Sequence, residues 1–422
     1  MPAPIVNALV TPNVFAKLTL FHLRSLNHIC RNMSTEVTPE FANKAMKIGD
    51  DVMVRRPYRF LVTEGMGYQP QALQDTFMHV KVDTALGIHF EWNSIEKTLS
   101  LREASDLYAK PAAIALSAEI NKRAGKFAAQ NTPNFVGVPG TPPTGIDTFL
   151  GAGDKIIELG CPENEELHLI MNRKMSSAYV NARANYFSQQ KETDQQLRQG
   201  RIVDSTLGYT INRDQGIYNH TCGVVGDHPV INTNAQQDVD GDNGTMNLVL
   251  NVATGSAIKK GDKLTIDNVY AVHPQTREST GSLKQFTVTA DAAAVAADLT
   301  VNIFPQITPA GQYQNVTAAA MTGAVVNFWA GLTATPTTSN SKVSPQALVM
   351  HKNAFAFVSV PLSNPEPRGV EVVTSERDPE TGLVLAFIRS FDNVERRWIN
   401  RFDCLIGFSK LYAAELSCVL AG

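Results

Sequence analysis

The sequence predicts an α+β fold into which a separate all-β, barrel-like domain is inserted. Segments with helical periodicity alternate with short apolar strands before residue 223 and again from residue 341. Between them, residues 223–340 are rich in Thr, Val, Asn, Gly and Ala, and short β stretches such as TMNLVLNVA and KQFTVTAD follow one another with turn residues between them. The change of composition at both ends of this region predicts an insertion.

Residues 1–48 are predicted to form an N-terminal arm built around one amphipathic helix at 10–33. Thr11 can cap the first amides of this helix, and Pro12 occupies a position where its missing N–H is not needed. Four apolar side chains recur at roughly helical spacing and define the expected buried face: Val14, Leu18, Phe21 and Ile29. An ordinary packing helix explains this pattern.

Residues 49–95 change to a period of two and predict an extended β-hairpin. One strand lies in DDVMVRRPYRFLV and the other in DTFMHVKVDTALGIHFEW, with a Gly-, Gln- and Pro-rich stretch between them. Pro57 marks the first strand as an edge strand, because proline cannot donate a ladder hydrogen bond. Three arginines lie on this hairpin, either as solvated charges or as contacts to a partner: Arg55, Arg56 and Arg59.

Residues 96–222 contain the longest helical segment, at 99–130, followed by alternating helices and strands. Pro111 is expected to kink this helix or to start a second one after Lys110. Its apolar face is predicted to contain four side chains: Ile114, Ala118, Ile120 and Phe127. Helices are then expected in IDTFLGAGDKIIELG and SSAYVNARANYF, and strands in LHLIM and LGYTINRD. Residues 341–422 resume the α+β pattern, with a strong strand in GLVLAFIRSFD.

Composition and charge disfavour several classes of protein. The 422 residues include 37 Lys+Arg and 40 Asp+Glu, a net charge of −3, so the chain lacks the basic stripe that neutralises nucleic acid phosphates. Its five cysteines are scattered, which does not suit a disulfide framework. The sequence contains no run of about 18 apolar residues, the length needed to span a bilayer as a helix. We therefore expect a soluble, cytoplasmic chain that does not contact a membrane.

The stretch DVDGDNG places Asp238, Asp240 and Asp242 at alternate positions, as in a calcium-binding loop. Asn243 stands where that loop requires glycine, and Val249 stands where it requires a bidentate glutamate. No helix signal flanks the stretch, and a β segment follows it. An acidic hairpin loop is therefore favoured over a metal site.

Other motifs give no sign of catalysis. NHTC places His220 near Cys222, but the sequence offers no second Cys/His pair to complete a zinc site. FLGAGDK is neither a phosphate-binding P-loop nor a complete dinucleotide fingerprint. G-x-S-x-G and H-E-x-x-H are absent from the sequence. We predict a protein that is not an enzyme and that needs no metal or cofactor.

Taken in order, these segments resemble the P22-like coat protein family of short-tailed bacteriophages, whose HK97-like subunit carries an inserted β domain. LVTPNVFAKLTLFHLRSLNHICRNMSTE resembles the family's N-terminal arm, and KIGDDVMVRRPYRF the strand that opens its extended hairpin. SLREASDLYAKPAAIALSAEINKRA resembles its long spine helix, and IKKGDKLTI with SLKQFTVTAD the core strands of its inserted barrel. LVMHKNAFAFVSVPL and DPETGLVLAFIRSFDN resemble the return into the main body. The resemblance covers nearly the whole chain in the right order.

This resemblance implies an HK97-like division of the chain. Residues 1–48 would be the N-terminal arm, 49–95 the extended hairpin or E-loop, and 96–222 the spine helix with the peripheral (P) and axial (A) domains. Residues 223–340 would be the inserted β domain, and 341–422 the return into the body. Six side chains on the hairpin and on the inserted domain's protruding loop become candidates for contacts between subunits: Arg55, Arg56, Arg59, Asp238, Asp240 and Asp242.

The function that the resemblance implies is that of a major capsid protein. Copies would assemble as hexamers and pentamers into an icosahedral shell around double-stranded DNA, contacting that DNA weakly and non-specifically. A separate scaffolding protein and a portal are expected as partners, with a decoration protein as a further candidate. Assembly would take place in the host cytoplasm, and the mature location would be the virion.

Physical arguments also favour a self-associating subunit. A long hairpin with an exposed edge invites association, which is a liability in a monomer but useful in a shell. Symmetry lets many modest contacts close such a shell. Two alternatives stay open: a phage tail or surface protein that uses its β domain to bind a ligand or calcium, and an enzyme without a familiar motif.

Overall fold

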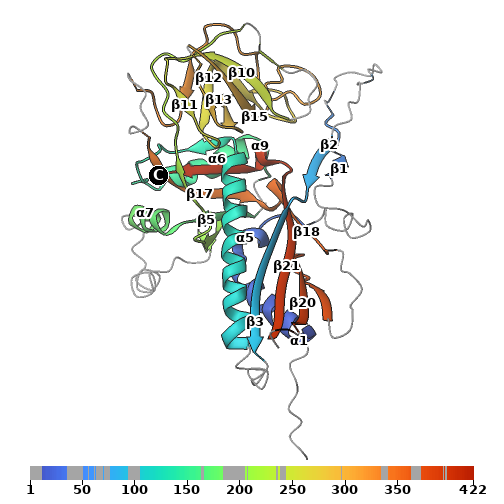
Figure 1. Cartoon of the computed structure of the whole chain (residues 1–422). Helices are drawn as coiled ribbons and strands as arrows, with labels where there is room; N and C mark the ends of the chain where they lie inside the picture. Colours follow the sequence, from blue (N-terminus) through green and yellow to red (C-terminus); the bar gives the residue numbers. More distant parts are fainter. Residues whose placement is uncertain are drawn as a thin grey trace, which may run out of the picture. The chain divides into compact units, whose positions relative to one another are not determined.

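The computed structural model places the chain in two compact units. The described residues are 12–35, 51–55, 57–60, 62, 70, 77–93, 105–162, 166–183, 205–206, 208–233, 236–237, 244–295, 297–333, 341–362, 372–392, 394 and 397–422. Unit 1 comprises Met1–Val54, His79–Ala124 and Ala356–Ser409, and unit 2 comprises Arg55–Met78, Gly125–Phe355 and Lys410–Gly422. One of the boundaries falls within the long helix α5 (Lys110–Asn131), seen in Figure 1.

A five-stranded sheet forms the centre of unit 1. Its strands are β18 (Phe355–Val360), β21 (Arg397–Lys410), β20 (Val384–Asp392) and β19 (Val372–Arg377) in spatial order, with β3 (Thr84–Asn93) also paired to β21. The long strand β21 runs antiparallel to both β20 and β3 (Figure 1). Phe387 and Phe402 are buried with their ring centroids 4.9 Å apart. The strand predicted in GLVLAFIRSFD is confirmed as β20.

The predicted N-terminal helix is confirmed, but its predicted buried face is partly wrong. The chain forms α1 (Pro12–Leu26) and, after a break at Asn27, the short helix α2 (His28–Arg31). Helix α1 contacts β19 and β20, and three of its apolar side chains are buried: Ala16, Leu20 and Leu23. Phe21 is 68% exposed, because it lies on the helix one residue away from that buried stripe.

The predicted hairpin is confirmed only for its first part. β1 (Asp51–Arg55) pairs with β2 (Phe77–Lys81) in a two-stranded sheet. The predicted second strand is interrupted at residues 82–83, and its continuation, β3, pairs with β21 instead of with β1. Val82 is buried at this corner between β2 and β3.

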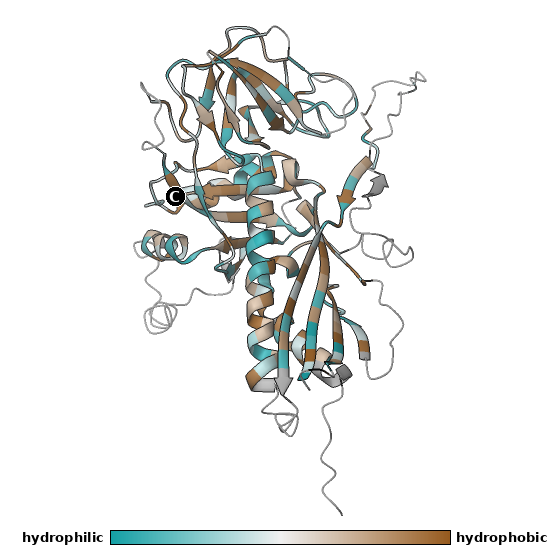
Figure 2. Cartoon of the chain, viewed as in Figure 1, coloured by the Kyte–Doolittle hydropathy of each residue, from teal (hydrophilic) through white to brown (hydrophobic). Residues whose placement is uncertain are grey.

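Pro111 lies at the start of a helix, which is one of the two roles that the sequence predicts for it. A π-helical turn, η2 (Ser105–Ala109), precedes α5, which begins at Lys110 and places Pro111 in its first turn. The predicted apolar face is wrong at Ile114 and Ala118, which are exposed. The buried stripe consists mainly of small residues at spacings of three or four: Ala113, Leu116, Ile120, Ala124 and Ala128. Figure 2 accordingly shows hydrophilic and hydrophobic segments together along α5.

A mixed sheet and two helices form one part of unit 2. In spatial order its strands are β4 (Asn134–Val136), β22 (Ser417–Ala421), β17 (Val343–His351), β5 (Leu167–Met171), β7 (Tyr209–Arg213) and β6 (Ser205–Thr206), and β8 (Asn219–Thr221) also pairs with β17. β4 is parallel to β22, and β5 is parallel to β7. Helices α6 (Asp147–Glu158) and α7 (Arg173–Arg183) share one apolar core with alternate residues of these strands. The helices and strands predicted here are confirmed within the described residues, and residues 184–187 of the predicted helix SSAYVNARANYF lie outside them.

A six-stranded sheet forms the other part of unit 2. In spatial order its strands are β16 (Val326–Phe328), β12 (Lys263–Val272), β13 (Ser279–Val288), β15 (Asp298–Phe304), β10 (Met246–Asn251) and β9 (Val230–Ile231). A small sheet, β11 (Ala257–Ile258) with β14 (Ala292–Ala293), lies in the same stretch of sequence. A core of its own, including Leu264, Phe286 and Val301, stabilises this part. The β stretches predicted within residues 223–340 are confirmed as strands.

The remaining described elements are short. They are the 3₁₀ turn η4 (Lys352–Ala354) and the helix α9 (Ala413–Leu416). All five cysteines are buried, and no disulfide joins them. Within the part of the chain that the structure describes, no helix has the length and hydropathy needed to cross a membrane. The architecture as a whole is a mixed α and β one.

Candidate functional site

Two of the six predicted contact residues have described positions. Arg55 is the last residue of β1, and Arg59 lies in the segment 57–60 that follows it. The other four lie outside the described residues: Arg56, Asp238, Asp240 and Asp242. Whether any of the six contacts another subunit therefore stays a prediction.

Arg59 has partners within its own chain. Its guanidinium Nη2 lies 2.5 Å from Glu415 Oε1, and the two side chains are only 20% and 18% exposed. The guanidinium carbon also lies 5.7 Å from the centroid of the Tyr313 ring, within the range of a cation–π contact. In the isolated subunit, Arg59 thus stabilises the segment 57–60 against the C-terminal part of unit 2.

We expect Arg59→Ala and Glu415→Ala to be energetically coupled by about 1–2 kcal/mol, because both groups are largely removed from solvent. A double-mutant cycle on the purified subunit, followed by urea unfolding, measures this coupling. The exposed pair Arg123 and Glu119 on α5 is the matched control, with an expected coupling below about 0.5 kcal/mol. Additive effects of the two substitutions would contradict the assignment.

Beneath the six-stranded sheet, polar side chains replace apolar ones. We define the polar seam as five side chains of β12 and β13 that hydrogen-bond to residues 129–135 or to Glu158 of helix α6, or that line a pocket beside that helix: Lys263, Ser282, Lys284, Gln285 and Thr287. Lys263 and Thr287 are cross-strand neighbours, so they share the face opposite to Leu264 and Phe286 of the core. All of these side chains except Lys284 join the sheet to the rest of unit 2 through hydrogen bonds.

Lys263 is fully buried at the C-terminal end of α5. Its ammonium donates to the Ala129 carbonyl at 3.0 Å, to the Thr132 carbonyl and to Thr287 Oγ1 at 2.8 Å. Burial lowers the pKa of Lys263 from 10.5 to about 7, against the opposing effect of the neighbouring Asp262 carboxylate. Carbonyls at a helix C-terminus carry partial negative charge and lack partners within the helix, so they suit a cation.

The side-chain amide of Gln285 makes hydrogen bonds to the backbone of β4 like those of a neighbouring strand. The Phe135 amide donates to Gln285 Oε1 at 2.8 Å, and Gln285 Nε2 donates to the Phe135 carbonyl at 2.9 Å. The Phe135 ring also meets Trp329 edge to face, with centroids 5.7 Å apart. A single side chain therefore satisfies both backbone groups of Phe135.

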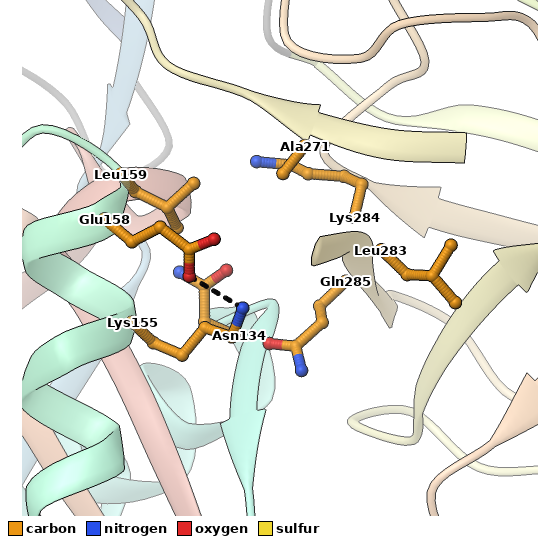
Figure 3. Close-up of a pocket in the computed structure, with 8 residues that line it drawn as sticks. All are labelled: Asn134, Lys155, Glu158, Leu159, Ala271, Leu283, Lys284 and Gln285. Carbon is orange, nitrogen blue, oxygen red and sulfur yellow. Dashed lines mark hydrogen bonds and ion pairs between the residues drawn. The ribbon is translucent and has the colours of Figure 1, made fainter. Parts of the chain in front are cut away.

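Lys284 is 3% exposed. Unlike Lys263, it lies beside a small pocket that Lys155 and Glu158 of helix α6 also line (Figure 3). It lines a cavity of about 10 Å³ together with Asn134, Lys155 and Glu158, which is room for about one water molecule. Among the described residues, the Lys284 ammonium makes no hydrogen bond or ion pair, and only burial and more distant charges affect its pKa. Burial lowers the pKa of Lys284 to about 8, the Glu415 carboxylate opposes this shift, and the Arg59 guanidinium adds to it.

The carboxylate beside Lys284 is already satisfied. Lys155 Nζ lies 2.8 Å from Glu158 Oε2, and the Ser282 hydroxyl donates to Glu158 Oε1. Burial raises the pKa of Glu158, but these two hydrogen bonds, together with the charge of Lys155 and a hydrogen bond from Thr280, hold that pKa below its usual value. Lys284 is therefore a buried cation whose nearest carboxylates are engaged by other cations.

His220, Cys222 and Asp262 come together in a buried cluster, with their ligand atoms within 4.8 Å of one another. His220 Nε2 lies 2.8 Å from Asp262 Oδ1, and His220 Nδ1 lies 2.9 Å from the Tyr218 hydroxyl. The second carboxylate oxygen of Asp262 accepts from two backbone amides, those of Gly223 at 2.9 Å and Lys259 at 2.8 Å.

This cluster is better suited to joining loops than to holding a metal ion. Both ring nitrogens of His220 and both oxygens of Asp262 are engaged in hydrogen bonds. Burial, followed by the charge of Asp262, raises the pKa of the Cys222 thiol, whereas a metal ligand must be a thiolate. The sequence showed the neighbours His220 and Cys222 but gave no signal for Asp262.

The buried lysines were also missed from sequence. Lys263 begins a strand in which polar and apolar residues alternate, a pattern that normally places lysine in solvent, and Lys284 lies beside another polar residue, Gln285, in β13. Only the packing of that face against another part of the chain reverses the expectation. The glycine before Asp262 and Lys263 marks the turn but not the burial.

The comparisons with known proteins identify the class of this chain. A family model described as "P22 coat protein - gene protein 5" matches residues 27–412. The match indicates a structural major capsid protein of a tailed bacteriophage, a subunit that assembles with its copies and is part of the virion. This chain belongs to the P22 coat protein family. A comparison with curated protein sequences gives no match.

Solved structures of phage proteins are similar to this chain. That of Mycobacterium phage Che8 shares 13% identity over 93% of this chain and 90% of its own, with a TM-score of 0.44. The capsid of Helicobacter pylori bacteriophage KHP30 shares 9% identity over 89% and 85%, with a TM-score of 0.36. The CUS-3 coat protein I-domain shares 28% identity over 26% of this chain and 94% of its own, with a TM-score of 0.16.

Proposed function

We propose that this coat protein assembles as hexamers and pentamers into an icosahedral shell that encloses double-stranded DNA. The observation that carries the proposal is the family match over residues 27–412. The subunit is proposed to be HK97-like, with α5 as the spine helix and β1–β2 as part of the extended hairpin. Residues 223–340 are proposed to be an inserted domain, which agrees with the separate core of the six-stranded sheet.

Copies of the same chain are the proposed main partners. Two apolar side chains of the hairpin segment, Phe60 and Val62, are largely exposed. Exposed apolar side chains next to an unpaired strand edge favour association with another chain. A scaffolding protein and a portal are proposed as further partners. Assembly is proposed to occur in the host cytoplasm. Contact with packaged DNA is proposed to be weak, because the net charge of the chain is −3.

The acidic residues Asp238, Asp240 and Asp242 are proposed to meet a basic surface on an adjoining subunit. Opposite charges across an interface fix its register and speed its formation. Arg55 and Arg56 are proposed as contacts of the hairpin in the same way. For Arg59, any such contact would compete with Glu415 of its own chain.

We expect Asp240→Lys to reduce the yield of closed shells by about tenfold, because one reversed charge removes an attraction and adds a repulsion at every copy of the contact. The variant is expressed with its scaffolding protein, and shells are counted by sedimentation and electron microscopy. Asp227→Lys, at an exposed position, is the matched control. Normal shells from Asp240→Lys would reject the acidic contact, whereas absence of shells from the unaltered chain would reject the proposed function itself.

A further inference from the structure

We propose that the Ala129 carbonyl, the Thr132 carbonyl and Thr287 Oγ1 form a preorganised binding site for a primary ammonium group. Lys263 fills this site from within the chain and so fastens the C-terminal end of α5 to the strands β12 and β13. The inference concerns the subunit itself and goes beyond the proposed shell function.

The number and nature of the partners support this assignment. A lysine ammonium has three N–H donors, and Lys263 uses them on three different oxygens. All three acceptors are neutral groups, and no carboxylate among the described residues lies within ion-pair distance of Lys263. Its position is thus set by three directed hydrogen bonds and by the negative end of a helix, with Asp262 as a more distant charge.

The end of α5 shows why the site is occupied. Four consecutive carbonyls, at residues 127–130, each accept a hydrogen bond from a side chain. Asn131 and Thr132, at the end of the helix itself, supply the first two donors. Lys263 and Thr287, more than a hundred residues further along the chain, supply the other two. Half of the cap therefore belongs to the six-stranded sheet.

Thr287 both binds the ammonium of Lys263 and caps the end of helix α5. Its hydroxyl accepts from Lys263 at 2.8 Å and donates to the Gln130 carbonyl at 2.9 Å. A hydroxyl can do both at once because it has one donor and two acceptor lone pairs. The oxygens are therefore held in place by bonds that do not depend on Lys263, so the site should keep its shape when the lysine is shortened.

Shortening Lys263 to alanine tests the site directly. Lys263→Ala removes three methylene groups and the ammonium, a fragment that n-propylammonium reproduces. We expect this variant to unfold at a Tm lower by about 5 °C or more, since two carbonyls lose a buried partner. Millimolar n-propylammonium at pH 6.5 should restore the Tm in a saturable way, because a ligand that binds only the folded chain stabilises it.

The controls separate a shaped ammonium site from general solvent effects. n-Propanol has the shape without the charge, and tetramethylammonium has the charge without N–H donors, so neither should restore the Tm. Lys284→Ala removes an equally buried lysine that lacks the three oxygens, and n-propylammonium should not raise the Tm of this variant in a saturable way. Equal rescue of both variants, or equal rescue by all three additives, would overturn the proposal.

A second measurement covers the case in which Lys263→Ala does not fold. Refolding yields of that variant are then compared with and without n-propylammonium, and an unchanged yield counts against the site. In the full chain, Thr287→Val removes one oxygen and should lower the Tm, whereas Thr287→Ser keeps the hydroxyl and should lower it much less. Equal losses for these two variants would show that the hydroxyl is not part of the site.

Discussion

Gly407→Ala is expected to lower the free energy of unfolding by about 3–5 kcal/mol. Gly407 lies in β21, and a Cβ atom there would stand only 2.2 Å from the Lys81 carbonyl oxygen and 3.0 Å from Val82 Cα. Both atoms belong to backbone, so no side chain can move aside. The methyl group therefore forces apart β21 and the corner between β2 and β3. Urea unfolding of the purified subunit measures the loss.

Gly151→Ala is the matched control for this substitution. Gly151 lies in α6, where a new Cβ would meet only Val136 Cγ1 at an ordinary contact distance of 3.7 Å. Alanine is also the better helix former, so this variant should be neutral or more stable by up to about 1 kcal/mol. If Gly407→Ala unfolded at the same urea concentration as the unaltered chain, the close approach at the corner would be wrong.

The corner matters for the proposed function because it is the base of the predicted hairpin. The Ser409 hydroxyl donates to the His79 carbonyl at 2.7 Å, which fixes β2 a second time beside the same part of β21. A hairpin that reaches a neighbouring subunit needs such a fixed base. Gly407→Ala should therefore reduce shell yield even in the fraction of subunits that folds.

Lys284→Met is expected to raise the free energy of unfolding by about 3 kcal/mol at pH 7. The lysine is buried without a partner of its own among the described residues, and burying a charge is unfavourable. Methionine nearly keeps the volume and tolerates the irregular cavity beside Lys155 and Glu158. The groups that face Lys284 are two cations and two carboxylates, Arg59, Lys155, Glu158 and Glu415, so its removal leaves them balanced.

The sign and the pH window follow from the pKa of Lys284. Below its folded pKa of about 8, both the folded and the unfolded chain hold the proton, and the folded chain bears the full unfavourable charge. Between pH 8 and the ordinary pKa of 10.5, only the unfolded chain holds it, so the stability of the unaltered chain rises with pH through this group. The advantage of Lys284→Met should therefore be largest below pH 8 and disappear toward pH 10.5.

Lys263→Met serves as the control for Lys284→Met. The substitution is the same and the burial is the same, but Lys263 satisfies three oxygens that methionine cannot reach with a donor. We expect it to destabilise the subunit, opposite to Lys284→Met. Urea titrations from pH 6 to pH 10 compare the two variants. A loss of stability for Lys284→Met at pH 7 would show that its ammonium has a favourable partner.

Local patterns in the sequence predicted most elements of the fold. Pro111 marked the start of α5, and the two-residue period marked strands such as β10, β12 and β20, because backbone conformation depends on near neighbours. The partner of β3 was not predictable, since β21 lies about 310 residues further along the chain and no local pattern relates the two strands. The exposure of Phe21 and Ile114 was missed for the same reason, because burial depends on which surface a helix packs against.

The candidate site was predictable only as a set of charges. The arginines and the acidic stretch were visible, but Arg59 and Glu415 are 356 positions apart and only folding brings them together. Lys263 and Lys284 looked like solvent-facing lysines, since alternation shows which residues share a face but not what covers it. The same limit applies to Asp262, which completes a cluster begun about forty residues earlier.

The side-chain amide of Gln285 limits unwanted strand pairing at the edge of β4. β4 ends the order of the mixed sheet, and an uncovered outermost strand would offer its N–H and C=O groups to any passing polypeptide. Because the Gln285 side chain occupies both the N–H and the C=O group of Phe135, these groups are not available to a strand of another chain. The outer edge of β4 is therefore closed at Phe135 to pairing with a strand of another chain.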